Sequence, residues 1–186
     1  DLDDKNSKPF SLDFETLDKE KKSNNLLHKC FSKFDTSLKV FDLTAGFCKD
    51  ACSIANMGFQ VTAYEKESWL FEFNKTCLSS LKKSNLKLIN LNSIRALKKV
   101  TKKDILFLDP MFEINSRASA KKEIQFLRKC ISTSSEKEIL DAAQKSSAGV
   151  IIIKRHKLSN SQNPTKPSYV IKGKVISFEV FDRRAV

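Results

Sequence analysis

The chain has 186 residues, which suffices for one α/β domain with a sizeable core but not for two domains of ordinary size. Its 34 Lys and Arg against 22 Asp and Glu give a formal net charge of +12, which favours a polyanionic partner such as RNA or DNA, although compositional drift toward lysine also fits. No apolar run approaches the roughly 20 residues of a transmembrane helix, so we expect a soluble protein with no membrane partner.

Residues 1–34 are predicted to form an N-terminal extension that ends in a helix near Asn25 to Phe34, and residues 35–186 form the main domain. In the main domain, short apolar runs alternate with segments of helical spacing, which predicts a mostly parallel sheet with helices on both faces. The strands are expected at LKVFDL, FQVTAYE, LKLINLN, DILFLDP and GVIIIKR, and the helices at 49–57, 68–83, 119–132 and 135–145. YVIKGKVISFEVF predicts a C-terminal antiparallel hairpin.

The first strand is followed by DLTAGFCKD, Asp42 to Asp50. Ligands of open α/β sheets bind beyond the carboxyl ends of the strands, and small residues around Gly46 let backbone amides approach a ligand. The loop has a single glycine, whereas a pyrophosphate-binding turn needs G-x-G-x-x-G. The bare tripeptide TAG fits an ordinary turn capped by Asp42 equally well.

Glu65 ends the second strand, 19 residues after Gly46, where an acid typically binds ribose hydroxyls. An adenosyl ligand without phosphates fits both features, and S-adenosylmethionine is the common one. Asn92 and Ser93 end the third strand and suit the edge of an adenine.

The fourth strand ends in LDPMF, which brings Asp109, Pro110 and Phe112 to the same edge. A buried carboxylate needs a partner, and the Pro110 carbonyl remains a free acceptor. Two acceptors would orient the amine of a nucleic-acid base toward a methyl donor, while Phe112 would stack on the base. The alternative is that Phe112 fills the core and Asp109 caps a turn.

These residues resemble class I S-adenosylmethionine-dependent methyltransferases that modify base amines, whose signature is D/N-P-P-Y/F. DLTAGFCKD, LDPMF, KKE and IIIKR resemble the RsmJ family more closely, in the same order from about Leu38 to Phe181. The resemblance implies a Rossmann-like methyltransferase domain over residues 35–186. It also implies methylation of guanine N2 in bacterial 16S ribosomal RNA.

The resemblance implies catalytic roles for Asp109, Pro110 and Phe112. Cofactor contacts are expected from the residues at the strand ends, which are Asp42, Gly46, Lys49, Asp50, Glu65, Lys66, Asn92, Ser93 and Asp109. The chain departs from the family at Cys48, where a second glycine is usual, at Lys49, where an arginine is usual, and in its shorter N-terminal region.

Basic residues follow the fourth and fifth strands and are predicted to contact RNA phosphates. They are Arg117, Lys121, Lys122, Lys154 and Arg155. Lys121 and Lys122 lie beside Glu123 and also fit an ordinary solvated helix face.

The leading hypothesis is a cytoplasmic enzyme that methylates a guanine N2 amine in 16S ribosomal RNA or the small ribosomal subunit, with a monomer favoured. Five scattered cysteines and two histidines give no metal-ligand spacing, so no metal is expected, and the thiols are expected to be reduced. One alternative is an adenine-N6 methyltransferase acting on DNA or RNA. Another is a non-catalytic RNA-binding or assembly protein on a decayed methyltransferase fold.

Overall fold

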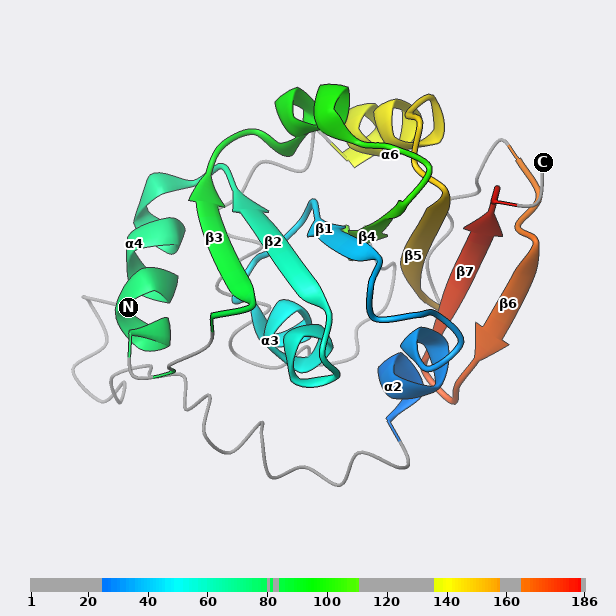
Figure 1. Ribbon diagram of the computed structural model, residues 1–186, viewed down its shortest axis with the longest axis horizontal. Coiled ribbons are helices and arrows are strands. Elements are labelled where there is room, and N and C mark those ends of the chain that lie inside the picture. Colours follow the sequence, from blue (N-terminus) through cyan, green and yellow to red (C-terminus); the bar gives the residue numbers. More distant parts are fainter. Residues whose placement is uncertain (1–24, 80, 82–83, 111–135, 158–164, 185–186) are drawn as a thin grey trace.

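One seven-stranded sheet forms the centre of the computed structural model, which describes residues 25–79, 81, 84–110, 136–157 and 165–184 (Figure 1). Its strand order is β3-β2-β1-β4-β5-β7-β6. The five parallel strands are β1 Lys39–Asp42, β2 Gln60–Glu65, β3 Leu86–Asn90, β4 Asp104–Leu108 and β5 Val150–His156. The hairpin strands β6 Tyr169–Lys172 and β7 Ile176–Asp182 are antiparallel to each other, and β7 is antiparallel to β5. The predicted fold class is confirmed.

Helices cover both faces of the sheet. One face carries α2 Leu26–Phe31, α3 Lys49–Asn56 and α4 Ser68–Leu78, and the other carries α6 Glu136–Gln144 and the 3-10 helix η2 Ser93–Lys99 (Figure 1). The apolar residues of β4 and β5 are buried throughout because both faces of these strands are covered. Helices α3, α4 and α6 match their predicted segments, α4 ending earlier than expected, whereas η2 was not predicted. The helix expected at 119–132 lies outside the described residues.

Helix α2 packs into the main core, although it lies within the predicted N-terminal extension. Asn25 caps it by accepting a 2.9 Å hydrogen bond from the Leu27 N–H, and Leu27, Cys30 and Phe31 are buried. The Phe31 ring lies edge-on to Phe59 at 5.4 Å between centroids. The described end of the extension is therefore part of the same folded unit, while the division at residue 34 stays a prediction.

Side-chain alternation brings four ionisable residues to one face of the sheet, beside α3. Asp42 and Glu65 end β1 and β2, Asp109 follows β4, and Lys154 lies near the end of β5. Each is two residues beyond a core residue of that face, as Asp109 is beyond Phe107. The parallel strands end at a common edge, so these charges are neighbours. Within the ranges given above, no helix has the length and apolar character needed to cross a membrane.

Candidate active site

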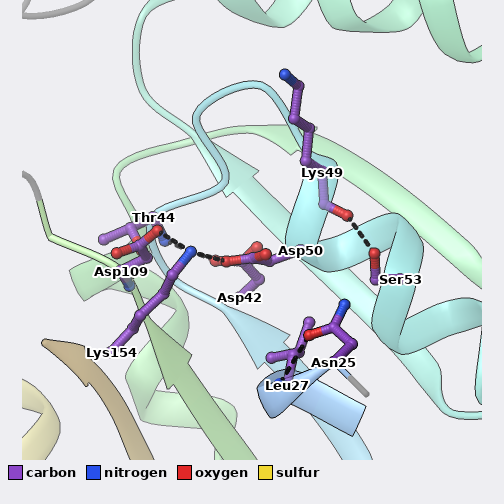
Figure 2. A network of polar contacts seen from close by, with 9 residues as sticks. All are labelled: Asn25, Leu27, Asp42, Thr44, Lys49, Asp50, Ser53, Asp109 and Lys154. Carbon is purple, nitrogen blue, oxygen red and sulfur yellow. Dashed lines mark hydrogen bonds and ion pairs between the residues drawn. The ribbon is translucent and has the colours of Figure 1, made fainter. Parts of the chain in front are cut away.

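Lys154 bridges two carboxylates at the carboxyl edge of the sheet (Figure 2). Its Nζ lies 2.7 Å from Asp50 Oδ2, in the first turn of α3, and 2.8 Å from Asp109 Oδ2, after β4. The structure thus brings together Asp50 and Asp109, as expected from the sequence. The Lys154 ammonium is held between these two carboxylates and its side chain is 21% exposed, so the expected contact with RNA phosphates stays a prediction.

Thr44 joins the loop after β1 to the end of β4. Its Oγ1 accepts a 2.7 Å hydrogen bond from the Asp109 N–H, and its own N–H donates to Asp42 Oδ1 at 3.0 Å. The sequence indicated only that Thr44 is small, because nothing in the loop shows which distant backbone group its hydroxyl will meet. Thr44 therefore fixes the position of the Asp109 backbone relative to the loop.

The pKa values of the cluster follow from burial and from mutual charge. Burial, together with the charges of Asp50 and Asp109, raises the pKa of Asp42 to about 8, although the Thr44 N–H and Lys154 lower it. Desolvation and the charge of Asp50 raise the pKa of Asp109 to about 6, while Lys154 lowers it. Burial lowers the pKa of Lys154, but the two carboxylates outweigh this effect and raise it overall. Lys154 is therefore charged at neutral pH.

The loop between β1 and α3 contains two residues with left-handed backbone. Gly46 has φ +49°, and Cys48, at the N-cap of α3, has φ +56°. This conformation favours glycine, which accounts for the glycine that the RsmJ family usually has where Cys48 stands. A Cβ at Gly46 would meet only the Thr44 carbonyl oxygen, at 3.8 Å, so the space beside the loop is left open by the described residues.

Asn74 on α4 supports the same loop from behind. Its amide Nδ2 donates a 2.6 Å hydrogen bond to the Gly46 carbonyl, and the side chain is fully buried. The sequence analysis missed this residue. The available signal was its spacing, because Asn74 lies four residues after Leu70 and four before Leu78, on the apolar stripe of the helix.

Glu65 is held at the end of β2 with its carboxylate fixed by backbone amides. Its Oε1 accepts from the Glu67 N–H at 2.9 Å, and the residue is 6% exposed. Burial raises its pKa, while the amides of Glu67, Lys66 and Gly46 lower it. Asn90, which the sequence analysis also missed, donates its Nδ2 to the Glu65 carbonyl at 2.8 Å and ties β3 to this strand end.

This arrangement of a glycine loop, an acid at the next strand end and an Asp-Pro after β4 agrees with the comparison with known proteins. The family described as "Putative SAM-dependent methyltransferase" matches residues 4–183. The chain belongs to this family of S-adenosylmethionine-dependent methyltransferases.

Relatives of this methyltransferase include proteins named Ribosomal RNA small subunit methyltransferase J. That of Coxiella burnetii (strain RSA 493 / Nine Mile phase I) is 29% identical over 151 residues, which are 76% of this chain and 59% of the relative. That of Buchnera aphidicola subsp. Schizaphis graminum is 28% identical over 174 residues, 87% of this chain and 70% of the relative. The chain thus spans about three fifths of the length of the Coxiella relative.

Solved structures agree with the methyltransferase fold. The S-adenosylmethionine-dependent methyltransferase NGO1261 from Neisseria gonorrhoeae superposes with a TM-score of 0.70 at 20% identity, covering 97% of this chain and 78% of that one.

The residues at the sheet edge fit S-adenosylmethionine, the cofactor of the family. The Glu65 carboxylate, fixed by backbone amides, suits ribose hydroxyls, and the open space beside Gly46 admits the close approach of a ligand. The carboxylates of Asp50 and Asp109 suit a cationic ligand, since together with Lys154 they carry a net negative charge when ionised. Within the described ranges, no group of three or more His, Cys, Asp or Glu could hold a metal ion.

The remaining predicted cofactor residues have local roles in the structure. The Lys49 side chain points away from the Asp50–Lys154 cluster (Figure 2), and its carbonyl accepts from Ser53 Oγ at 3.0 Å. Lys66 Nζ lies 3.9 Å from a Glu67 carboxylate oxygen. Asn92 caps η2 by accepting from the Ile94 N–H at 3.1 Å, and Ser93 is buried beside it.

Arg155 lies on the opposite face of β5 from Lys154. Its side chain is 5% exposed, and its Nε donates to Glu179 Oε2 at 3.2 Å. Its predicted contact with RNA phosphates stays a prediction. Pro110 is buried directly after Asp109. Phe112, Arg117, Lys121 and Lys122 lie outside the described residues.

Proposed function

We propose that this chain transfers the methyl group of S-adenosylmethionine to the N2 amine of a guanine in 16S ribosomal RNA. The observation that carries the proposal is the fixed position of Asp109 after β4, on the edge that also carries Gly46 and Glu65. Thr44 binds its backbone N–H, and Lys154 binds its carboxylate. The relatives named Ribosomal RNA small subunit methyltransferase J support the choice of substrate. The net charge of +12 supports an RNA partner.

The chemistry asks little of the protein beyond positioning. The bound cofactor supplies an electrophilic methyl group. A guanine N2 amine is a weak nucleophile because its lone pair is delocalised into the ring. Asp109 accepts a hydrogen bond from the amine, which directs the remaining lone pair toward the methyl group, and the Pro110 carbonyl is the second acceptor. Glu65 holds the cofactor ribose.

Asp109 must be ionised to accept hydrogen bonds with both oxygens. Its pKa of about 6 means that the carboxylate predominates at neutral pH. Methyl transfer should therefore fall on acidification below about pH 6, as Asp109 takes up a proton. We further propose that the acceptor is the small ribosomal subunit or its RNA, encountered in the cytoplasm.

The test is methyl incorporation from radiolabelled cofactor into small subunits that lack the modification, into naked 16S ribosomal RNA and into DNA. The expected product, identified by mass spectrometry of nucleosides, is N2-methylguanosine in RNA. Asp109→Ala should lower kcat by at least about 100-fold, because it removes the principal acceptor. N6-methyladenine as the product would instead establish an adenine methyltransferase. RNA binding without any methyl transfer would establish the non-catalytic alternative.

Cofactor binding is tested separately by calorimetry. Glu65→Ala should weaken S-adenosylmethionine binding about tenfold or more, because hydrogen bonds to a charged group contribute about 1.5 to 3 kcal/mol. Glu72→Gln is the matched control, since Glu72 is an exposed acid on the neighbouring helix α4. Equal losses in both variants would contradict the assignment of Glu65.

A further inference from the structure

Lys154 lies between two acids that come from distant parts of the chain. Asp50 is 104 residues before it and Asp109 is 45 residues before it, and both ion pairs are shorter than 3 Å. The side chains are 21%, 27% and 41% exposed for Lys154, Asp50 and Asp109, respectively. Such partly buried pairs are screened less by salt than surface pairs are.

The bridge offsets a repulsion that the fold itself creates. The loop after β1 brings Asp50 to the edge where β4 delivers Asp109, and each carboxylate raises the energy of ionising the other. Asp42 adds a third acid on β1. Lys154 forms an ion pair with both Asp50 and Asp109, and its charge also lowers the pKa of Asp42.

The contacts of Asp109 are divided between its atoms. The backbone N–H is bound by Thr44, and Oδ2 is bound by Lys154. Among the described residues, none donates a hydrogen bond to Oδ1. Because the backbone N–H and one carboxylate oxygen of Asp109 are both bound, the other carboxylate oxygen points in a defined direction.

We propose that Lys154 is a positioning residue for methyl transfer, which keeps Asp109 ionised and anchored through Oδ2 while Oδ1 accepts the hydrogen bond of the target amine. The inference rests on the proposed function, because Oδ1 accepts a hydrogen bond from the target amine only if the chain is a base-amine methyltransferase. Lys154 acts through Asp109 and does not touch the reacting atoms. This differs from the phosphate contact that the basic residues at the end of β5 suggested.

Removing the positive charge should reveal the repulsion. Without the Lys154 charge, the repulsion among the carboxylates of Asp50, Asp109 and Asp42 is no longer offset by these ion pairs. The pKa of Asp109 should then rise by about one unit or more. The acidic limb of the kcat profile should move upward by the same amount. At about pH 6.5, kcat should fall about threefold or more, while the Kd for RNA changes little.

The kinetic experiment compares five forms of the chain with small subunits as substrate. They are the unchanged chain, Lys154→Met, Lys154→Arg, Lys154→Met combined with Asp50→Asn, and Lys39→Met. Lys154→Arg should retain the acidic limb, because it keeps the charge. At saturating cofactor, the double variant should have a higher kcat than Lys154→Met, because removing the second acid removes the repulsion. Lys39, exposed at the far end of β1, controls for the loss of one positive charge.

A second readout does not depend on activity. Carbon-detected NMR of the aspartate carboxyl groups, assigned with Asp109→Asn, measures the titration of Asp109 in the same variants without cofactor. Lys154→Met should shift it upward and Lys39→Met should not. Lys154→Gln is the second variant should Lys154→Met not fold, since glutamine keeps hydrogen-bond donors but lacks the charge.

The outcomes separate the two proposals. If the unchanged chain transfers no methyl group, the proposed function is overturned. If Lys154→Met nevertheless shifts the titration of Asp109 upward, control of Asp109 by Lys154 is supported. An unshifted Asp109 titration overturns the role of Lys154, whatever the activity. A loss of RNA affinity in Lys154→Met, with kcat and its pH profile unchanged, also overturns it and restores the phosphate contact.

Discussion

The Thr44 hydroxyl and the Asp109 backbone N–H form a 2.7 Å hydrogen bond between residues 65 positions apart. Through this bond, the loop after β1 and the end of β4 that carries Asp109 are held as one unit. A change in one is therefore transmitted to the other.

Thr44→Val should separate these two parts. Valine has nearly the same shape but no acceptor, so the partly buried Asp109 N–H loses its partner, and the free energy of unfolding should fall by about 1 to 3 kcal/mol. Urea denaturation measures this change. Thr44→Ser keeps the hydroxyl and should retain most of the stability. Equal losses in the two variants would indicate that the methyl group, rather than the hydrogen bond, is what matters.

Asp42→Asn should change the pH dependence of stability. The folded pKa of about 8 exceeds the ordinary value of 3.8, so the folded chain holds a proton that the unfolded chain releases. The contribution of Asp42 to stability is thus largest below about pH 4 and falls as the pH rises toward about 8. Asparagine stays neutral and can still accept from the Thr44 N–H.

Relative to the unchanged chain, Asp42→Asn should therefore gain stability between about pH 4 and pH 8, by an amount on the order of 2 to 5 kcal/mol, and should gain no more above that range. Urea denaturation at about pH 5, 7 and 9 gives the difference. A difference that stays constant across these pH values would mean that Asp42 titrates normally.

Asn74→Asp should disturb the glycine loop from behind. The variant has the same shape, but its carboxylate cannot donate to the Gly46 carbonyl and instead sets two acceptors against each other in a buried place. Stability should fall by about 2 kcal/mol or more, and S-adenosylmethionine should bind about tenfold more weakly to the folded chain.

The control for Asn74 is Asn85→Asp. Asn85 Nδ2 donates to the Ala55 and Phe59 carbonyls at 2.7 and 3.0 Å, away from the glycine loop. This variant should lose stability for the same reason but keep its affinity for the cofactor once folded. Similar calorimetric losses in both variants would remove the special role of Asn74.

Arg155→Met should affect folding more than RNA binding. Removing the cation leaves Glu179 without its Nε donor, and stability should fall by about 1 to 3 kcal/mol, less than for a fully buried pair because the Glu179 side chain is 25% exposed. Filter binding of folded protein to ribosomal RNA should change less than twofold. A large loss of RNA affinity in a stable variant would contradict the buried placement.

The fold could be predicted from the sequence because the strand runs, the helical segments and the turn residues all indicated the same architecture. Buried runs such as ILFL and VIII were separated by segments of helical period, and the Lys172 to Lys174 turn separated two β-rich runs. The strand ends were therefore predictable, and with them the convergence of Gly46, Glu65 and Asp109 on one edge.

The pairing of the charges was less accessible. Lys154 and Arg155 were interpreted together as a basic cluster, yet the two-residue period of a strand sends neighbouring side chains to opposite faces. Applying that period would have separated them. The partners Asp50 and Asp109 are more distant in sequence, and which acid a lysine meets depends on strand order and register, which local patterns do not specify.

The contact of α2 with the C-terminal hairpin constrains the order of assembly (Figure 1). Leu26 approaches Gly173, and the Lys33 ammonium lies over the Tyr169 ring at 5.1 Å. During synthesis α2 leaves the ribosome long before β6 and β7, so its apolar face stays without these partners until almost the whole domain has been made. Strands β6 and β7 therefore complete the packing of α2, and a nascent chain stalled before β6 would carry Leu26 and its neighbours as exposed sites for chaperone binding.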